Sequence, residues 1–305
     1  MQLIRDIDNI KFPHNGYVAS IGNYDGMHLG HQRIISKVKA QSLAMKLPSL
    51  VIIFEPQTTE YFLKQHANPR LMSLREKLVI LQSYGIDWVL CLRFNDRLAN
   101  MTAEQFIQDI LLQRLSIQHI IFGDDFAFGN NRTGGFELLQ QYIATEKVPT
   151  IQINNTKVSS THIRQALAAN DFKSAATLLG RSYTISGRVA HGDKLGHKLG
   201  FPTANIYLQH KILPIRGVYI TKVYNLANKA LIGVTNVGNR PTINGSRNVL
   251  EVHLLNFAKD IYGKRITIEF IKKLRDEIKF ASLDELKQQI EKDVKQASTF
   301  TVKDS

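Results

Sequence analysis

Cysteine is almost absent from this sequence, and long uninterrupted apolar runs are missing altogether. The 305 residues include one cysteine, Cys91, which has no partner for an internal disulfide and no spacing typical of a metal site. No run approaches the roughly 20 apolar residues of a membrane helix, and the charged N-terminal segment lacks the continuous apolar core of a secretion signal. These absences argue against disulfide-stabilised secreted proteins and membrane proteins, and we expect a cytoplasmic protein without a membrane partner.

Acidic residues are also in deficit, most of all in the second half of the chain. The net charge is +13, and residues 181–305 carry 21 Lys and Arg against 11 Asp and Glu. A basic surface suits nucleotides, phosphorylated metabolites or nucleic acid. A solvated surface rich in lysine has the same charge, so charge alone leaves the partner open.

Apolar runs and stretches of helix length alternate in the first half. The expected strands are residues 17–22, 50–54, 88–93, 119–122 and 150–153. Ser73 with Glu76 and Thr102 with Gln105 form capping-box patterns, and Gly85 marks a helix end. The alternation predicts a parallel sheet covered on both faces, because a parallel crossover needs a dozen or more residues. Ligands of such sheets bind at the carboxyl ends of the strands.

The second half has closely spaced strands separated by Gly, Pro and Asn. These runs are residues 184–189, 217–223, 230–238, 248–257 and 265–271. The pattern predicts an antiparallel barrel or sandwich. One helix follows, with Ser282 as its cap, Glu285 completing the box, and Leu286 and Ile290 in its apolar stripe. We place the boundary at residues 179–182, which gives domains 1–182 and 183–305.

The segment IGNYDGMHLGHQ follows the first expected strand and begins a helix. Gly22 and Gly26 permit tight turns and a close approach of a ligand to the backbone. His28 and His31 are three residues apart, so they share one face of the helix beginning, where unpaired N–H groups attract anions. A glycine-containing turn with two surface histidines fits the same residues.

Two further segments of the first half indicate anion and ring binding. VSSTHIRQAL places Ser159, Ser160 and Thr161 at a helix beginning with Arg164 one turn later, which builds a phosphate site from hydroxyls, N–H groups and a guanidinium. A plain helix cap with a surface arginine is the alternative. IFGDDFAFGNNRTGG combines acidic residues and phenylalanines at a strand end, where aromatic rings hold a planar ligand, although the same composition is typical of a polar loop.

These three motifs, in this order, resemble the adenylyltransferase domain of the bifunctional riboflavin kinase/FMN adenylyltransferases, the bacterial FAD synthetases. The resemblance covers residues 15–180. It implies that ATP phosphates are bound by His28, His31, Ser160, Thr161 and Arg164, with His28, His31 and Arg164 catalytic. It implies nucleotide binding by Gly22, Asn23 and Asp25, and flavin binding by Asp125, Phe126 and Phe128. Two departures are Tyr24, where the family usually has Phe, and FEPQT, whose second proline is lost so that the loop is less constrained.

The implied reaction of this domain is an adenylyl transfer. An FMN phosphate oxygen attacks the α-phosphorus of ATP, and pyrophosphate leaves. Such transfers are catalysed mainly by positioning and charge stabilisation, which agrees with the absence of a Ser/His/Asp nucleophile set from the sequence.

The segment GRVAHGDKLGHKLGFPTANI, in the second half, is a basic loop with four glycines. Thr203 and Asn205 are two apart and point to the same side of an extended chain. Their oxygens are hard ligands of the kind that Mg²⁺ accepts beside substrate phosphates. A Gly/Pro turn leading into a strand is the alternative interpretation.

Glu251 lies on the expected strand VLEVHLLNF, on the same face as Val249, His253 and Leu255. A carboxylate among apolar neighbours needs a partner or a task. It fits a general base that removes a proton from an attacking hydroxyl. It also fits an ion pair with one of three arginines: Arg240, Arg247 or Arg275.

The motifs of the second half resemble the riboflavin kinase domain in sequence and order, from about residue 183 to 295. The resemblance implies a small antiparallel β-barrel with a C-terminal helix. It implies that Thr203 and Asn205 hold Mg–ATP and that Glu251 activates the riboflavin 5′-hydroxyl. The phosphate loop would be shaped by Gly192, Lys194, Gly200 and Pro202, and the flavin side formed by Arg275 and Phe280. Two departures are His197 in place of Arg and Asn256 in place of Asp.

The combined expectation is an α/β Rossmann-like nucleotidyltransferase domain with a parallel sheet, followed by an antiparallel barrel with a terminal helix. This bifunctional enzyme would use riboflavin, FMN and ATP with Mg²⁺, and neither nucleic acid nor an obligate protein partner is expected. Another adenylyl- or cytidylyltransferase would leave GFPTAN and Glu251 without a task. A basic nucleic-acid-binding module would need aromatic stacking platforms among its lysines, and the sequence shows no convincing set.

Overall fold

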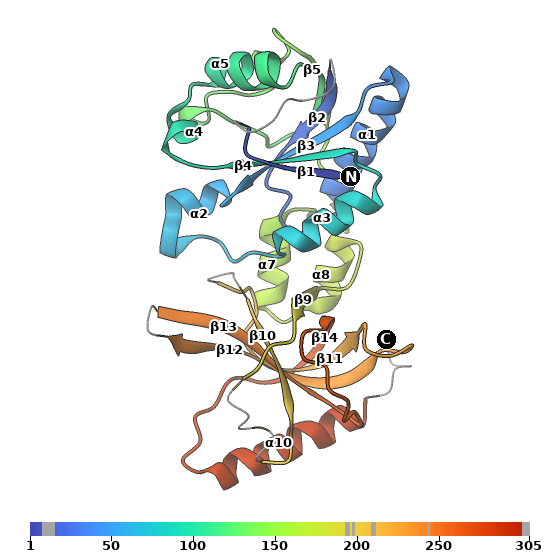
Figure 1. Ribbon diagram of the computed structural model, residues 1–305, viewed down its shortest axis with the longest axis vertical. Helices are drawn as coiled ribbons and strands as arrows, with labels where there is room; N and C mark the ends of the chain where they lie inside the picture. Colours follow the sequence, from blue (N-terminus) through green and yellow to red (C-terminus); the bar gives the residue numbers. More distant parts are fainter. Residues whose placement is uncertain (8–15, 193–195, 197–198, 209–211, 243–244, 301–305) are drawn as a thin grey trace. The chain divides into compact units, whose positions relative to one another are not determined.

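The computed structural model describes residues 1–7, 16–192, 196, 199–208, 212–242 and 245–300 (Figure 1). The chain divides into two compact units. The first consists of Met1–Asn68 and Met72–Ser160, and the second of Pro69–Leu71 and Thr161–Ser305. Within the described ranges, no helix is both long enough and apolar enough to cross a membrane.

The first unit contains a six-stranded parallel sheet with the strand order β1-β4-β3-β2-β5-β6. Its strands are β1 (Gln2–Arg5), β2 (Tyr17–Ile21), β3 (Ser49–Glu55), β4 (Trp88–Arg93), β5 (Ile117–Gly123) and β6 (Ala144–Val148). The helical segments of this unit are α1 (Leu29–Met45), α2 (Thr58–Leu63), η1 (Lys64–His66), α3 (Leu74–Ser83), α4 (Asp96–Asn100), α5 (Ala103–Gln105), η2 (Phe106–Arg114), η3 (Asn130–Arg132) and α6 (Phe136–Leu139).

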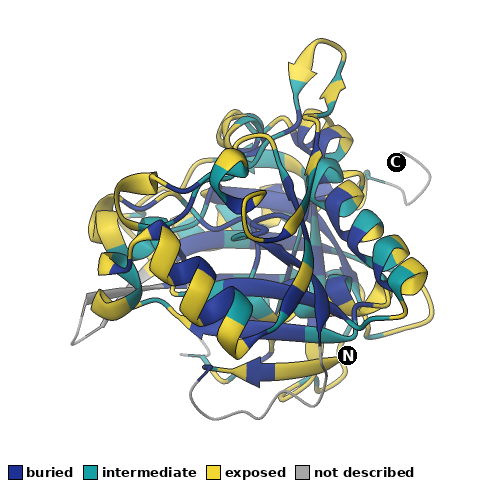
Figure 2. Ribbon diagram, turned by 90° about the horizontal axis from the view of Figure 1, so that it is seen from above, coloured by how far each residue is buried: buried dark blue, intermediate teal, exposed yellow. Residues whose placement is uncertain are grey.

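Both faces of this sheet are covered. Leu50 and Ile52 of β3 pack into one hydrophobic core, with η2 and α6, while Val51 and Ile53 pack into another, with α1 and α3. Because both faces are buried, the central strands are continuous apolar runs rather than alternating ones. Figure 2 shows the strands mainly buried and the helices with one buried and one exposed side.

The position of the first site follows from the strand order. The chain runs from β2 through α1 to β3 on one side of β2, whereas β5 lies on the other side. The connections after β2 and β5 therefore diverge and leave a crevice at the carboxyl ends of these strands, which is the usual ligand position in such sheets.

The second unit contains a six-stranded antiparallel sheet with the strand order β10-β13-β12-β11-β14-β9. A bridge between Ala190 and Asn205 brings the two edges together and nearly closes the barrel. Its elements are α7 (Ser160–Ala168, which begins at the last residue of the first unit), α8 (Phe172–Leu179), β9 (Thr184–Arg188), β10 (Thr203–Tyr207), β11 (Gly217–Tyr224), β12 (Leu231–Thr242), β13 (Gly245–Leu254), β14 (Arg265–Arg275) and α10 (Leu283–Ser298).

Aromatic packing joins α8 to the barrel. The Phe172 ring lies 5.8 Å from that of Tyr219 and 6.1 Å from that of Phe270, centroid to centroid. The Tyr219 hydroxyl donates to the Asn170 side-chain oxygen at 3.1 Å. These contacts explain why α7 and α8 group with the barrel rather than with the parallel sheet.

The structure confirms the expected fold class, with differences at the sheet edges and one cap. Gln152–Ile153 (β7) does not join the main sheet but forms a separate hairpin with Thr156–Lys157 (β8), so the expectation of a sheet strand at 150–153 is wrong. The capping boxes of α3 and α5 are present. Ser282 caps α10 as expected, but the Glu285 carboxylate accepts from the backbone N–H of Ala281 rather than that of Ser282.

Candidate active sites

The first cavity, of about 210 Å³, lies at the carboxyl ends of β2 and β5. Gly22, His28 and His31 line it from the connection after β2 and the beginning of α1, and Asp125 and Phe126 line it from the connection after β5. The crevice expected from the strand order is therefore the place where residues singled out from these two segments of the sequence meet.

The two histidines form a stacked pair at the N-terminus of α1. His28 is the N-cap, and its Nδ1 accepts a hydrogen bond from the His31 backbone N–H at 3.3 Å. The rings lie 3.5 Å apart, centroid to centroid, with an interplanar angle of 18°. A neutral His28 must carry its proton on Nε2, because Nδ1 is the acceptor. The pair thus combines imidazole donors with the unpaired N–H groups of a helix beginning.

Tyr24 fixes the connection between β2 and α1. Its backbone has φ = 48°, in the left-handed region, and its hydroxyl donates to Ser20, which in turn donates to the Ile121 carbonyl oxygen. Burial raises the pKa of the Tyr24 hydroxyl well above its ordinary value, which keeps it protonated and able to donate. The hydroxyl that distinguishes Tyr24 from the usual Phe therefore ties the connection after β2 to Ser20, whose own hydroxyl links β2 to β5.

Asn23 is held from two other elements. The buried Lys77 of α3 donates to its backbone oxygen, and its Nδ2 donates to the hydroxyl of Thr58, the first residue of α2, at 3.2 Å. Thr58 occupies the position of the second proline in the FEPQP-type segment, so the departure at this position provides an acceptor. Asp25, which is buried, accepts at its backbone oxygen from the Ser160 hydroxyl at 2.8 Å.

The connection after β5 is fixed by two carboxylates. Asp124 accepts from the Thr150 backbone N–H at 2.6 Å, and this hydrogen bond holds the pKa of Asp124 below its ordinary value. Asp125 forms an ion pair with Lys157 of the β7–β8 hairpin at 2.5 Å, with 73% of the Asp125 side chain exposed. The hairpin is thereby tied to the rim of the cavity.

The two phenylalanines of this connection differ in position. Phe126 lines the cavity and stacks on Phe128, with centroids 5.6 Å apart and an interplanar angle of 19°. Phe128 is buried in the hydrophobic core against Phe106. Phe126 is therefore placed to meet a ring directly, while Phe128 supports it from below.

Thr161 and Arg164 lie on α7 in the second compact unit. The Arg164 Nε donates to the Pro69 carbonyl oxygen at 2.7 Å, a contact within that unit. This bond explains why Pro69–Leu71 group with the barrel unit although their neighbours in sequence belong to the first.

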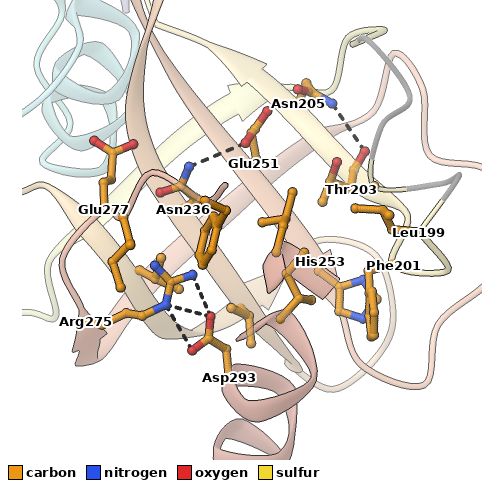
Figure 3. Close-up of a pocket in the computed structure, with 17 residues that line it drawn as sticks. Leu199, Phe201, Thr203, Asn205, Asn236, Glu251, His253, Arg275, Glu277 and Asp293 are labelled. Carbon is orange, nitrogen blue, oxygen red and sulfur yellow. Dashed lines mark hydrogen bonds and ion pairs between the residues drawn. The ribbon is translucent and has the colours of Figure 1, made fainter. Parts of the chain in front are cut away.

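The second cavity, of about 470 Å³, lies between the barrel strands, the 275–280 segment and α10 (Figure 3). Its polar wall is formed by residues on the strands: Thr203, Asn205, Asn236, Glu251 and His253. Leu286 and Ile290 of α10 supply apolar side chains opposite. The apolar stripe predicted for the last helix therefore faces a cavity.

Glu251 lies between two asparagines on adjacent strands. The pairing register places it opposite Asn205 of β10 on one side and Asn236 of β12 on the other, as Figure 3 shows. Asn236 Nδ2 donates to Glu251 Oε2 at 3.5 Å. Asn236 is a residue that the sequence reasoning missed. The sequence pattern that identified Glu251 could also have identified Asn236. It is a polar side chain on the same strand face as an apolar residue, Val234.

Asn205 is 4% exposed, and its Nδ2 donates to the Thr203 carbonyl oxygen at 3.3 Å. Among the residues that the structure describes, its Oδ1 is buried without a hydrogen-bond partner. Gly192 lies against this amide, since a Cβ there would be 2.4 Å from Asn205 Nδ2. A buried oxygen without a hydrogen-bond partner destabilises the protein on its own. The Asn205 Oδ1 is therefore suited to contact a bound ligand.

Arg275 forms an ion pair with Asp293 of α10. Its Nε lies 3.0 Å and 3.2 Å from the two carboxylate oxygens, and its Nη2 lies 2.8 Å from one of them. The Phe280 ring centroid is 5.8 Å from the Arg275 Cζ. Arg275 is therefore not the ion-pair partner of Glu251 that the sequence left open. The side chains of the other two candidates, Arg240 and Arg247, lie outside the described residues.

The loop before β10 is described only in part. Lys194 and His197 fall outside the described residues. Gly200 has φ = 89°, a conformation that favours glycine. Pro202 follows, and its carbonyl oxygen lies 2.9 Å from His253 Nδ1.

Two ligand-sized cavities, one at the N-terminus of a helix and one beside a carboxylate that lies between two asparagines, are the sites expected of a phosphate-transferring enzyme with two active centres. The comparisons with known proteins agree with this class. A family model described as FAD synthetase matches residues 11–162, and one described as riboflavin kinase matches residues 179–301.

Known relatives match the whole chain. The bifunctional riboflavin kinase/FMN adenylyltransferase of Escherichia coli K12 is 45% identical over 98% of this chain and 98% of the relative. The enzyme of the same description from Haemophilus influenzae is 43% identical over 98% and 99%. A solved structure described as a macrolide-efflux protein from Streptococcus pneumoniae has a TM-score of 0.76 and 27% identity over 98% of this chain and 99% of that one.

The chain therefore belongs to the family of bifunctional riboflavin kinase/FMN adenylyltransferases. The family and the enzyme class predicted from the sequence motifs are confirmed.

Proposed function

We propose that the chain phosphorylates riboflavin to FMN in the barrel cavity and adenylylates FMN to FAD in the sheet cavity, using ATP for both steps. The observation that carries the proposal is Glu251, a carboxylate that lies between two asparagines on the wall of a 470 Å³ cavity and accepts from one of them, Asn236. The two activities named for the relatives provide the substrates that fit the two cavities.

In the kinase step, Glu251 is the general base. It takes the proton of the riboflavin 5′-hydroxyl as the oxygen attacks the γ-phosphorus of ATP, and the bond from that phosphorus to the bridging oxygen breaks, so that ADP leaves. Asn236 donates to the carboxylate and fixes its direction. Arg275 and Phe280 lie on the flavin side, and the apolar side chains of α10 cover the ring.

Thr203 and Asn205 fit an Mg²⁺ ion that accompanies ATP. The fit rests on Asn205 Oδ1, which is buried and has no hydrogen-bond partner in the described part of the chain. The same described part contains no cluster of three or more His, Cys, Asp or Glu, so the remaining ligands would come from phosphates and water. When bound, the ion would stabilise negative charge on the phosphate oxygens. Gly192, Gly200 and Pro202, with Lys194, would shape the loop around those phosphates.

In the adenylyl transfer, an FMN phosphate oxygen attacks the α-phosphorus of ATP while the bond to the pyrophosphate oxygen breaks. His28 and His31 donate to the phosphate oxygens from the beginning of α1, where the helix N–H groups add to the positive potential. Gly22, Asn23 and Asp25 position the nucleotide, and Asp125, Phe126 and Phe128 the flavin. Ser160, Thr161 and Arg164 assist on the pyrophosphate side.

We further propose a functional boundary at 182/183. The two matched families, at residues 11–162 and 179–301, leave only a short stretch between them and support a division close to this boundary. The cytoplasmic location, the lack of a nucleic-acid partner and the lack of an obligate protein partner stay predictions.

A reciprocal pair of variants tests the assignment of the two sites. Glu251→Gln removes the base and should lower FMN formation by roughly 10²–10⁴-fold, while FAD formation from supplied FMN stays within about twofold. His28→Ala should lower FAD formation from FMN by on the order of 10²-fold and leave the kinase unchanged. Both are measured by separating flavins after incubation with Mg–ATP.

Thermal melting of each variant serves as the folding control. Equal loss of both activities in one folded variant would contradict the assignment of independent sites. Unchanged riboflavin with the unmodified chain would contradict the proposed function itself.

A further inference from the structure

His253 lies two residues after Glu251 on β13 and faces the same cavity. The pairing register places it directly opposite Thr203, the residue with which β10 begins. It is therefore next to the chain segment that carries the proposed nucleotide ligands, although it has no part in the proton transfer assigned to Glu251.

The ring of His253 is fixed by two contacts with the turn before β10. Its Nδ1 lies 2.9 Å from the Pro202 carbonyl oxygen. A carbonyl oxygen only accepts hydrogen bonds, so Nδ1 must carry the proton. The Phe201 ring meets the imidazole edge to face, with centroids 5.5 Å apart and an interplanar angle of 81°. Figure 3 shows the two rings side by side.

Within the described part of this loop, two other features fix the turn before β10. Gly200 is in the left-handed region, and Phe201 donates back to Gly196 at 2.8 Å. Pro202 has no N–H with which to join a ladder, and the pairing of β10 with β13 begins only at Thr203. The His253 side chain therefore attaches the Pro202 carbonyl to strand β13, one residue before Thr203.

We propose that His253 is a positioning residue of the kinase site, whose Nδ1–H holds the Pro202 carbonyl so that Thr203 and Asn205 face the nucleotide phosphates. This inference rests on the proposed kinase function. It goes further because it assigns a task to a side chain that is neither the proposed base nor one of the proposed Mg–ATP ligands. A shift of about 1 Å in a positioned group costs on the order of 10²-fold in rate.

Two substitutions that preserve polarity separate the two ring nitrogens. In His253→Asn, the amide nitrogen takes the place of Nδ1 and keeps the donor to Pro202. In His253→Gln, the amide nitrogen takes the place of Nε2, and the donor at Nδ1 is lost. The measurements are kcat and KM of FMN formation for ATP and for riboflavin, with the intact chain.

The Asn variant should keep kcat/KM for ATP within about threefold of the unmodified chain. The Gln variant should lose roughly 10- to 100-fold in kcat/KM for ATP, with KM for riboflavin and the formation of FAD from FMN nearly unchanged. Quenching of riboflavin fluorescence on binding confirms that the cavity is intact in both variants.

Three outcomes would overturn the inference: full activity in the Gln variant, equal loss in both variants, or loss in Asn with retention in Gln, which would point to Nε2. Failure of the proposed function has a different signature, since the unmodified chain would then form no FMN and Glu251→Gln would change nothing.

Discussion

At the scale of single residues, the barrel cavity depends on how closely the backbone approaches the Asn205 amide. Gly192 allows this approach because it has no side chain. A Cβ at this position would lie 2.4 to 2.6 Å from three atoms of the Asn205 amide. Real Cβ atoms almost never come so close to other heavy atoms, so any larger residue must displace the amide or the loop.

Gly192→Ala should therefore weaken the kinase without unfolding the barrel. We expect kcat/KM for ATP in FMN formation to fall by roughly 10- to 100-fold, because the amide oxygen proposed to meet the metal ion is displaced. FAD formation from supplied FMN is the internal control and should stay unchanged. Kinase activity equal to that of the unmodified chain would show that Asn205 does not need its present position.

The sequence reveals residues of this kind unevenly. Glu251 is recognisable because a carboxylate on an apolar strand face is unfavourable unless it has a partner or a function. Asn236 and His253 are harder to find, because their roles depend on the register that pairs β13 with β12 and β10, and register is a property of the folded sheet. Phe128 is an aromatic residue of the type that binds planar rings, but it is buried in the core. A single sequence does not show which of two neighbouring aromatic residues faces inward.

At the scale of elements, a buried ion pair joins α10 to β14 beside the barrel cavity, in addition to the apolar packing of Ala297 and Val294 against the strands. The side chains of Arg275 and Asp293 are 17% and 5% exposed, and Gln289 also donates to the Asp293 carboxylate at 2.9 Å. Breaking such a pair by removing one partner costs about 3–5 kcal/mol, because a buried charge remains.

Asp293→Asn should therefore lower the melting temperature of the barrel and raise KM for riboflavin in the kinase assay, while KM for FMN in the adenylyl transfer stays the same. The double variant Arg275→Met/Asp293→Leu is the matched control. It should recover much of the lost stability, because two apolar side chains leave no uncompensated charge, but not the affinity for riboflavin. If the single variant is as stable as the unmodified chain, the ion pair does not hold α10.

Most strands and the terminal helix were predictable, and the exceptions at the sheet edges have a common cause. The central strands carry continuous apolar runs because both of their faces are buried. The edge strand β6 reads ATEKV and has one fully buried residue, and β1 is four residues long with a single buried position. Edge strands bury less surface and need fewer apolar residues, so their pattern resembles that of a loop. A different cause applies to the expected sheet strand at 150–153: its last two residues form a hairpin with Thr156–Lys157 around Asn154 and Asn155, both at positive φ.

At the scale of the whole molecule, the described residues that line each cavity belong to a single compact unit. Each cavity is thus expected to bind its own nucleotide. Titration of the intact chain with a non-hydrolysable ATP analogue and Mg²⁺ should give about two equivalents, one for each phosphate site.

Site variants assign the two equivalents. His28→Ala should abolish binding of the ATP analogue to the sheet cavity. Asn205→Ala should abolish its binding to the barrel cavity. A single equivalent in the unmodified chain, measured by calorimetry, would refute the picture of two independent nucleotide sites.

Asn205 takes part in two structures at once. Its backbone oxygen accepts from Ala190 at 2.8 Å and joins the two edges of the barrel, and its side chain lines the ligand cavity. With the role proposed for Asn205, opening of the barrel at this edge would also disrupt the phosphotransfer site. A nucleotide bound to the Asn205 side chain would in turn stabilise the bridge that closes the barrel.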